Sequence, residues 1–130
     1  MILAIRTDNP EAKLYMLSPK GEEIESDIWL AGRDLSMQLN QHIDQLIKSQ
    51  DLKLADITGV IVFAGPGSFT GLRIGISVAN AIAYSLNILI VSGFGDGWIK
   101  QASAKLKQAK VGEYVMPEYG GEANITQPRK

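Results

Sequence analysis

The stretch from Ala64 to Gly75, AGPGSFTGLRIG, has the residue types of a loop that could bind an anion. It follows the apolar run ITGVIVF and precedes a long run of apolar and small residues. This order predicts a strand, a tight turn and the start of a helix, where outward-pointing backbone N–H groups attract phosphate and other anions. The glycine-rich loop that would do this consists of Gly65, Pro66, Gly67, Ser68, Phe69, Thr70 and Gly71.

Neither common nucleotide-binding motif fits this loop. The dinucleotide fingerprint requires two residues between its last two glycines, whereas three residues separate Gly67 from Gly71. A P-loop requires a lysine after its final glycine, and this chain has Leu72 after Gly71. Two interpretations stay open. The loop binds an anion, or it only turns the chain and lets Ser68 or Thr70 cap the next helix.

No other residues predict catalysis, a metal site or a cofactor. The chain has no cysteine, and its single histidine, His42, lies on the flank of an expected helix. A nucleophile and its base would have to combine Ser68 or Thr70 with His42, and nothing in the sequence brings these residues together. The acidic residues are scattered over expected turns and helix faces, where solvated charges are the rule. We therefore expect no catalytic residue, no metal and no cofactor.

The first half of the chain predicts three strands and a helix. Apolar runs at residues 2–5, 12–18 and 24–30 are separated by turn residues, which is typical of strands in an antiparallel meander. After these runs, Asp34 or Gly32 can cap an amphipathic helix. The helix is indicated by apolar residues at three- and four-residue intervals, namely Leu35, Leu39, Ile43, Leu46 and Ile47.

The second half predicts a parallel strand–helix–strand unit and one more helix. Val60–Ala64 is continuously apolar, as expected of a strand covered on both faces. A helix from about Thr70 to Leu86 and a buried strand over Asn87–Ser92 follow, with a right-handed crossover. The run WIKQASAKLKQAK at residues 98–110 predicts a basic amphipathic helix capped by Asp96.

Together these elements predict an α/β fold with a mixed sheet. A three-strand meander, a helix and a strand–helix–strand unit are typical of a single actin-like or ribonuclease-H-like lobe. This lobe would occupy residues 1–110. The polar, turn-rich residues 111–130 would form an extended C-terminal arm.

The helix expected after the loop carries a stripe of small residues. Gly71, Gly75, Ala79 and Ala83 recur every four residues, which places them on one face. Larger apolar residues flank the stripe, and the polar residues form one narrow strip. A helix this apolar needs cover on two sides, of which the sheet is one. The second cover is either a neighbouring helix of the same chain or a helix of a partner protein.

Length, charge and hydropathy limit the classes of protein to which the chain can belong. Its 130 residues suffice for one domain with its own core. No apolar stretch approaches about 20 residues, so we expect no membrane span. The absence of cysteine is typical of the reducing cytoplasm. A net charge of −1 argues against a large basic footprint, so we expect any contact with tRNA to be indirect.

The loop and both ends of the chain resemble one family. GPGSFTGLRIG at residues 65–75 closely resembles the signature of the TsaB (YeaZ) family, and ILAI at residues 2–5 resembles its first strand. MPEYGGEANITQPRK at residues 116–130 is similar to its C-terminal arm. The resemblance implies an actin-like ATPase fold that has lost catalysis. It implies a role beside TsaD, which carries the metal and the transfer chemistry that makes threonylcarbamoyladenosine next to the tRNA anticodon. TsaE and a threonylcarbamoyl-adenylate synthase complete that pathway.

The resemblance also implies a partner surface. In such proteins the first helices pair with the equivalent helices of TsaD, and the small-residue stripe fits such a pairing. We therefore expect a non-catalytic scaffold, or dimerisation, subunit that binds TsaD and reaches TsaE through the complex. Ala79→Arg would then abolish partner binding and leave the domain folded. The expected interface consists of Leu39, Ile43, Leu72, Arg73, Gly75, Ile76, Ala79 and Ala83.

Three departures from the family pattern bear on these expectations. Arg6 stands where the family usually has an aspartate after the first strand, which argues against a metal–phosphate role there. Leu35 follows Arg33 and Asp34 where the family usually has a histidine. Most of the second actin-like lobe is missing before the C-terminal arm, so we expect a shortened form in which one chain cannot build the nucleotide cleft between two lobes.

Three alternatives to the scaffold role stay open. One is a minimal nucleotide hydrolase or anion-binding protein that uses the loop near Gly67. Another is a homodimeric regulator whose self-association through the same helices competes with TsaD. The third is a protease, after the old glycoprotease label of the family, although no protease constellation is visible in the sequence.

Overall fold

The computed structural model describes residues 1–67 and 69–116 of the chain. These residues form five strands, three α-helices and one short 3-10 helix. In chain order the elements are β1 (Ile2–Arg6), β2 (Glu11–Leu17), β3 (Glu23–Leu30), α1 (Leu35–Ser49), η1 (Leu54–Asp56), β4 (Gly59–Gly65), α2 (Phe69–Leu86), β5 (Leu89–Phe94) and α3 (Trp98–Leu106).

The strands form one mixed sheet in the order β3-β2-β1-β4-β5. Antiparallel pairing joins β1 to β2 and β2 to β3, as the meander predicts. Parallel pairing joins β1 to β4 and β4 to β5, with α2 as the crossover between the last two strands. The predicted α/β fold with a mixed sheet is therefore confirmed.

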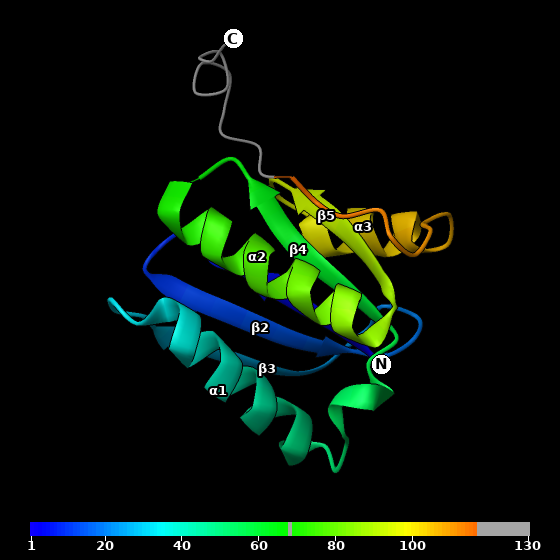
Figure 1. The fold of residues 1–130 in the computed structure, drawn as a ribbon, viewed down its shortest axis with the longest axis horizontal. Helices are drawn as coiled ribbons and strands as arrows, with labels where there is room; N and C mark the ends of the chain where they lie inside the picture. Colours follow the sequence, from blue (N-terminus) through cyan, green and yellow to red (C-terminus); the bar gives the residue numbers. More distant parts are fainter. Residues whose placement is uncertain (68, 117–130) are drawn as a thin grey trace, which may run out of the picture.

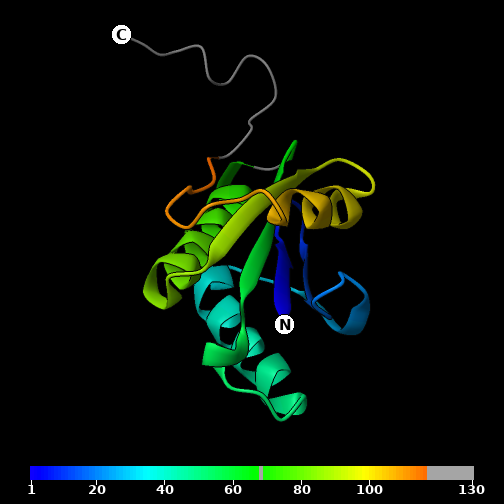
Figure 2. The same ribbon diagram turned by 90° about the vertical axis from the view of Figure 1, so that its right-hand side faces the viewer.

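Helices cover the sheet from both sides. Figure 1 shows α1 and α2 lying side by side in front of the sheet, and α3 behind it. Figure 2, turned by 90°, separates the two layers, with α1 and α2 on one side of the strands and α3 on the other. The larger core cluster lies under α1 and α2, and a smaller cluster that includes Phe63, Trp98 and Ala102 lies under α3.

The burial of β4 explains its continuous apolar sequence. All seven residues from Gly59 to Gly65 are buried, because helices lie against both faces of this central strand. In β2, by contrast, burial alternates with partial exposure along most of the strand. Among the described residues, no helix is both long and apolar enough to span a membrane.

The helix starts differ from the caps expected from the sequence. Asp34 occupies the N-cap position of α1, but its side chain makes no capping hydrogen bond. The N-cap of α3 is Gly97, in the left-handed conformation with φ 70°, instead of Asp96. Thr70 lies inside α2, which begins at Phe69, so Thr70 is not its cap. Ser68, the other expected cap, lies outside the described residues.

The expected C-terminal arm is described only as far as residue 116. Within this part, Val115 is buried against the core beneath α2. Its backbone N–H donates to Asn80 Oδ1 and its carbonyl accepts from Asn80 Nδ2, each at 3.0 Å. The first residues of the arm therefore pack back on α2, and the boundary at residue 110 stays a prediction.

Candidate functional site

The glycine-rich loop connects β4 to α2 beside the end of β1. A Cβ atom on Gly67 would lie against Asp8 Cβ, closer than two carbon atoms can approach. The buried Thr7 donates its Oγ1–H to the backbone carbonyl of Gly71 at 2.6 Å. Gly65 has a φ of 132°, in the region that favours glycine. The described contacts thus give the loop a structural role, and its anion-binding role stays a prediction.

Arg6 and Asp8 form an ion pair next to this loop. Arg6 Nε and Nη2 donate to the two carboxylate oxygens of Asp8 at 2.8 and 3.1 Å. The guanidinium carbon of Arg6 also lies 3.9 Å from the centre of the Phe63 ring. The two charges at the end of β1 therefore neutralise one another, and both oxygens of the Asp8 carboxylate accept hydrogen bonds from Arg6.

A surface pocket of about 440 Å³ opens at the start of α2 beside this ion pair. Its lining includes Thr7 and Asp8 after β1, Arg33 before α1, and Thr70 and Gly71 in the first turn of α2. Backbone N–H groups of a first helical turn and an arginine both favour a bound anion. This pocket is where the predicted anion site would lie.

Most of the expected interface residues lie in the core of this chain. The buried residues among them are Leu39, Ile43, Leu72, Gly75, Ile76, Ala79 and Ala83. Their small or apolar side chains let α2 approach the sheet and α1 closely. These side chains pack within the chain's own core, and their part in a partner interface stays a prediction. Arg73 is exposed and stays a candidate.

Two corrections follow from the same packing. Ala79 is 0% exposed, so an arginine at this position would place a charge in the core and unfold the domain. The expectation that Ala79→Arg leaves the domain folded is therefore wrong. Gly75 packs against Thr7 of the same chain, where an added Cβ would overlap Thr7 Oγ1. This internal contact accounts for the glycine in mid-helix.

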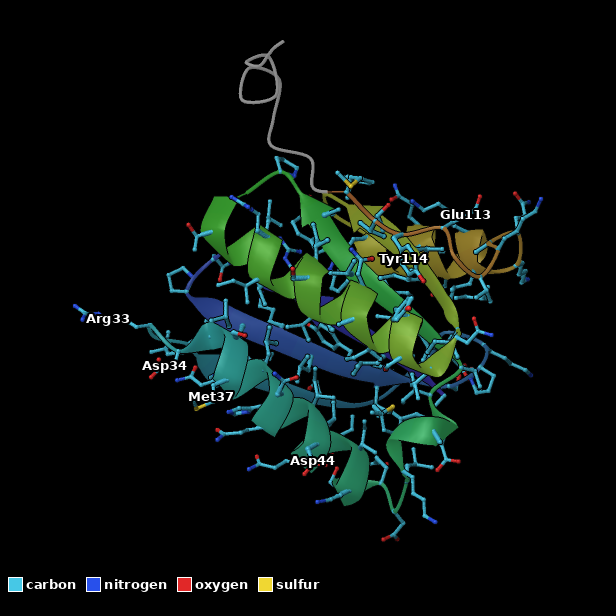
Figure 3. All side chains as sticks on the ribbon, viewed as in Figure 1. Arg33, Asp34, Met37, Asp44, Glu113 and Tyr114 are labelled. Carbon is cyan, nitrogen blue, oxygen red and sulfur yellow. The ribbon has the colours of Figure 1, made fainter. Side chains whose placement is uncertain are left out.

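The outer surface of the helix pair presents a different set of residues. A groove of about 390 Å³ lies between the first turns of α1 and α2, lined by Ser36, Thr70, Arg73, Ile74, Ser77 and Val78. Figure 3 shows Met37 and Asp44 projecting away from the sheet on α1, and Met37 is 62% exposed. Small polar residues, two partly buried apolar residues and one arginine thus form the accessible face of the pair.

His42 has partners that the sequence did not reveal. Its ring is stacked on Trp29, with ring centres 3.7 Å apart and planes 5° from parallel. Its Nδ1 lies 2.7 Å from Asp27 Oδ2, and Trp29 Nε1 donates to Gln38 Oε1 at 3.2 Å. This cluster ties α1 to the edge strand β3. Period-two alternation places Asp27 and Trp29 on one face of β3, but only the packed structure shows that α1 covers that face.

The described residues hold few chemically unusual groups. Within residues 1–67 and 69–116, no three His, Asp or Glu side chains lie close enough together to share a metal ion. Burial raises the pKa of the Tyr15 phenol, and the nearby negative charge of Glu23 raises it further. Tyr15 packs edge-on against Trp98 with ring centres 6.1 Å apart, so this pKa shift belongs to a core residue.

Comparison with known proteins places the chain in a family. The family model described as TsaD, tRNA N6-adenosine threonylcarbamoyltransferase, matches residues 28–92, which is half of the chain. A curated relative, tRNA threonylcarbamoyladenosine biosynthesis protein TsaB of Bacillus subtilis, is 33% identical over 89 residues. The chain belongs to the TsaB/YeaZ family. The matched region contains α1, β4, the glycine-rich loop and α2, whereas the site residues after β1 lie before it.

Other TsaB relatives and solved YeaZ structures agree with this assignment. TsaB of Haemophilus influenzae is 27% identical over 84% of this chain. YeaZ from Pseudomonas aeruginosa matches 70% of the chain with a TM-score of 0.63 and 24% identity. A second structure, titled as similar to peptidase YEAZ from the same bacterium, matches 71% with a TM-score of 0.61 and 26% identity. The actin-like, ribonuclease-H-like lobe predicted from the sequence is thereby confirmed.

The matches cover only part of the TsaB relatives. The chain spans 38% of the Bacillus subtilis protein and 45% of the Haemophilus influenzae protein. It spans 42% and 43% of the two YeaZ chains. A shorter match, 43% identical over 49 residues, joins the chain to the tRNA N6-adenosine threonylcarbamoyltransferase of Geotalea daltonii. The lobe seen here is thus less than half the length of these TsaB and YeaZ proteins.

Proposed function

We propose that this TsaB/YeaZ-family chain acts in the biosynthesis of threonylcarbamoyladenosine on tRNA, as a non-catalytic subunit that supports TsaD in the cytoplasm. The names of the curated relatives support the pathway. The TsaD family model and the Geotalea daltonii match indicate that TsaD has a related lobe. Two related lobes can pair through equivalent helices, and TsaE would then join through that complex.

The observation that carries this proposal is the accessible face of α1 and α2. The buried side of both helices is occupied by the chain's own sheet and core, so a partner must use the outer side. There the groove is lined partly by the small side chains of Ser36, Thr70 and Ser77. Small residues allow a facing helix to come close, and the exposed Arg73 of the groove and Met37 on the outer side of α1 can contact that helix.

The non-catalytic part of the proposal rests on the end of β1. Arg6 is a cation, so it cannot ligate a metal or activate water as a carboxylate would. Asp8 accepts both hydrogen bonds from the Arg6 guanidinium, which occupies its carboxylate. His42 lies on α1 against β3 and is engaged by Asp27 and Trp29, away from the loop residues with which a hydrolase would need to combine it. The catalytic chemistry would then come from TsaD.

Sedimentation velocity with TsaD of the same organism tests the proposal. The unaltered chain should form a heterodimer, and Ser77→Arg should abolish it because the arginine would fill the groove between the helices. Ala104→Arg is the matched control, since Ala104 is exposed on α3, on the opposite side of the sheet. Circular dichroism checks that both variants fold.

Two results would contradict the proposal. If the chain and TsaD sediment as separate species, the chain is not a TsaD subunit. If Ser77→Arg binds TsaD as well as Ala104→Arg does, the outer face of α1 and α2 is not the interface. A homodimer of the chain alone that dissociates in Ser77→Arg would favour the self-associating regulator that uses the same face.

A further inference from the structure

The surface around α3 and the β5 edge carries positive charge, although the net charge of the whole chain is close to zero. The chain has 13 basic and 14 acidic residues, but the segment from Gly97 to Gly112 contains four lysines and no acidic residue. Four acidic residues, in contrast, lie between Glu22 and Asp27 on and before β3, at the opposite edge of the sheet. The near-neutral total therefore conceals two separated regions of opposite charge.

The lysines of this segment are accessible. Lys100, Lys105, Lys107 and Lys110 are exposed, and among the described residues none of them lies in a salt bridge. Asp96 precedes the segment and Glu113 follows it, where Glu113 Oε1 accepts from the backbone N–H of Lys110. Lys100 and Lys107 are two helical turns apart, about 10 Å along the axis. The segment thus presents four exposed cations, with one carboxylate before it and another after it.

Lys105 reaches from α3 to the edge of the sheet. Its Nζ donates to Ser92 Oγ at 3.3 Å and lies 5.4 Å from the centre of the Phe94 ring. Because β5 is an edge strand, these contacts place the ammonium group at the margin of the sheet. Figure 2 shows the chain after α3 crossing from the α3 side of β5 to the α2 side. The chain between α3 and Tyr114 thus leads around the β5 edge toward α2.

Exposed aromatic rings lie where this crossing segment meets α2. Tyr84 on α2 is 75% exposed and Tyr114 is 44% exposed, with ring centres 6.4 Å apart and planes inclined by 52°. Figure 3 shows Tyr114 over the boundary between α2 and β5. The two hydrogen bonds between Asn80 and Val115 hold the backbone next to Tyr114 against α2. Two large rings are therefore kept at the surface in a fixed place.

We propose that the α3 lysines and the Tyr84–Tyr114 pair form a binding strip for RNA with unpaired bases. Exposed lysines, linked by a short chain segment to exposed aromatic rings, match a phosphate backbone whose bases can stack on those rings. An anionic membrane surface fits less well, because an interfacial helix needs a free apolar face. The apolar side of α3 is already buried, with Trp98 6% and Ala102 0% exposed.

The identity of the RNA bound in the cell rests on the proposed role in tRNA modification. The binding strip itself lies on a different surface from the proposed TsaD interface. The TsaD interface would use the outer face of α1 and the adjoining side of α2, whereas the strip lies on α3, the β5 edge and the Tyr84 end of α2. It also revises the expectation, drawn from net charge, that the chain meets tRNA only through a partner. RNA binding is measured with the isolated chain, so its outcome is independent of whether TsaD binds.

Fluorescence anisotropy with a labelled RNA hairpin that has an unpaired loop tests the lysines. The logarithm of the association constant should fall linearly with the logarithm of salt concentration. Lys100→Gln with Lys107→Gln should make this slope shallower by about 1.4, because single strands contribute about 0.7 per phosphate contact. Lys48→Gln with Lys53→Gln is the matched control, since both lysines are exposed at the end of α1 and after it. An unchanged slope in the first pair, or equal changes in both pairs, would overturn the proposal.

A second pair of variants tests the aromatic rings. Tyr84→Leu with Tyr114→Leu should weaken hairpin binding by about 5- to 100-fold, the loss expected when a base can no longer stack on an aromatic ring. Binding to a blunt RNA duplex of the same composition should not change, and Tyr84→Phe with Tyr114→Phe should restore hairpin binding. If the leucine variants bind the hairpin normally, or lose duplex and hairpin binding equally, the rings take no part and the strip as proposed is wrong.

Discussion

The contact between Gly75 and Thr7 gives a sharp prediction for a single methyl group. In an unobstructed helix, replacing glycine by alanine stabilises the protein by about 1 kcal/mol. Here the added Cβ would overlap the hydroxyl oxygen of Thr7, which is 2% exposed. That hydroxyl also donates to the carbonyl of Gly71. We therefore expect Gly75→Ala to destabilise the domain.

The magnitude follows from three contributions. Forcing a methyl group into a packed site costs about 1–3 kcal/mol. Displacing Thr7 from its hydrogen bond with Gly71 costs about 1 kcal/mol more. The gain in helix propensity offsets about 1 kcal/mol. The net loss in the free energy of unfolding is about 2 kcal/mol, which for a domain of this size lowers the melting temperature by about 6–10 °C.

Urea unfolding followed by the fluorescence of Trp29 and Trp98 measures this change. Thr7→Ala removes the hydroxyl that the added methyl group would overlap, so the double variant should recover most of the loss caused by Gly75→Ala. A double-mutant cycle then gives a favourable coupling of about 1–2 kcal/mol between the two positions. Gly32→Ala is the control, because a Cβ there meets no atom within 4 Å, and its effect should stay within about 0.5 kcal/mol.

Either of two results would refute the reasoning. If Gly75→Ala is as stable as the unaltered chain or more stable, the glycine is not required by Thr7. If Gly75→Ala is destabilised but Thr7→Ala does not relieve the loss, the overlap lies elsewhere in the packing of α2.

Two further predictions concern the other unusual contacts. In an alkaline titration followed by phenolate absorbance, Tyr15 should ionise after the exposed tyrosines, because burial and then the charge of Glu23 raise its pKa. Because the pKa of Tyr15 is higher in the folded than in the unfolded protein, Tyr15 stabilises the fold at pH values below the unfolded pKa of about 10. This stabilisation is lost as the pH rises through the folded pKa. Tyr15→Phe should therefore remove this loss of stability at alkaline pH. His42→Ala should lower the free energy of unfolding by about 1–2 kcal/mol, because it removes both the ring stacked on Trp29 and the partner of Asp27. His42→Phe should restore the part due to stacking, and an equal loss in both variants would show that the stack contributes nothing.

Much of the fold follows from local pattern. The alternating runs at the start of the chain, the three- and four-residue spacing of Leu35, Leu39 and Ile43, and the continuous run before the loop each predict an element that the structure contains. Most of their boundaries shift by one or two residues, and β5 begins at Leu89 instead of Asn87. The last helix, predicted over residues 98–110, ends four residues earlier, at Leu106. The caps of α1 and α3 were harder to predict, because whether a side chain reaches a backbone N–H depends on the approach of the preceding loop.

The candidate site was predicted less completely. The glycine-rich loop and α2 are recognisable in the sequence, and the family of the chain was predicted from them. The partner face stays a prediction, because the same apolar and small residues that suit a helix–helix interface also suit a core. Burial of Leu72 and Ala79 within the chain assigns them to the core and leaves the outward strip with Arg73 and Ser77. The partners of His42 lie on β3, 13 and 15 residues earlier, beyond the reach of helix periodicity.

By itself the sequence determined the order and type of the elements, since hydrophobic period and turn residues act over a few positions along the chain. It also determined the absence of cysteine chemistry and the near-neutral total charge. Only the tertiary structure decided which side of each helix is free, because that depends on how closely α2 approaches the sheet at Gly75. It also decided that Lys105 reaches the β5 edge and that the rings of Tyr84 and Tyr114 meet, because packing brings together residues that no local period relates.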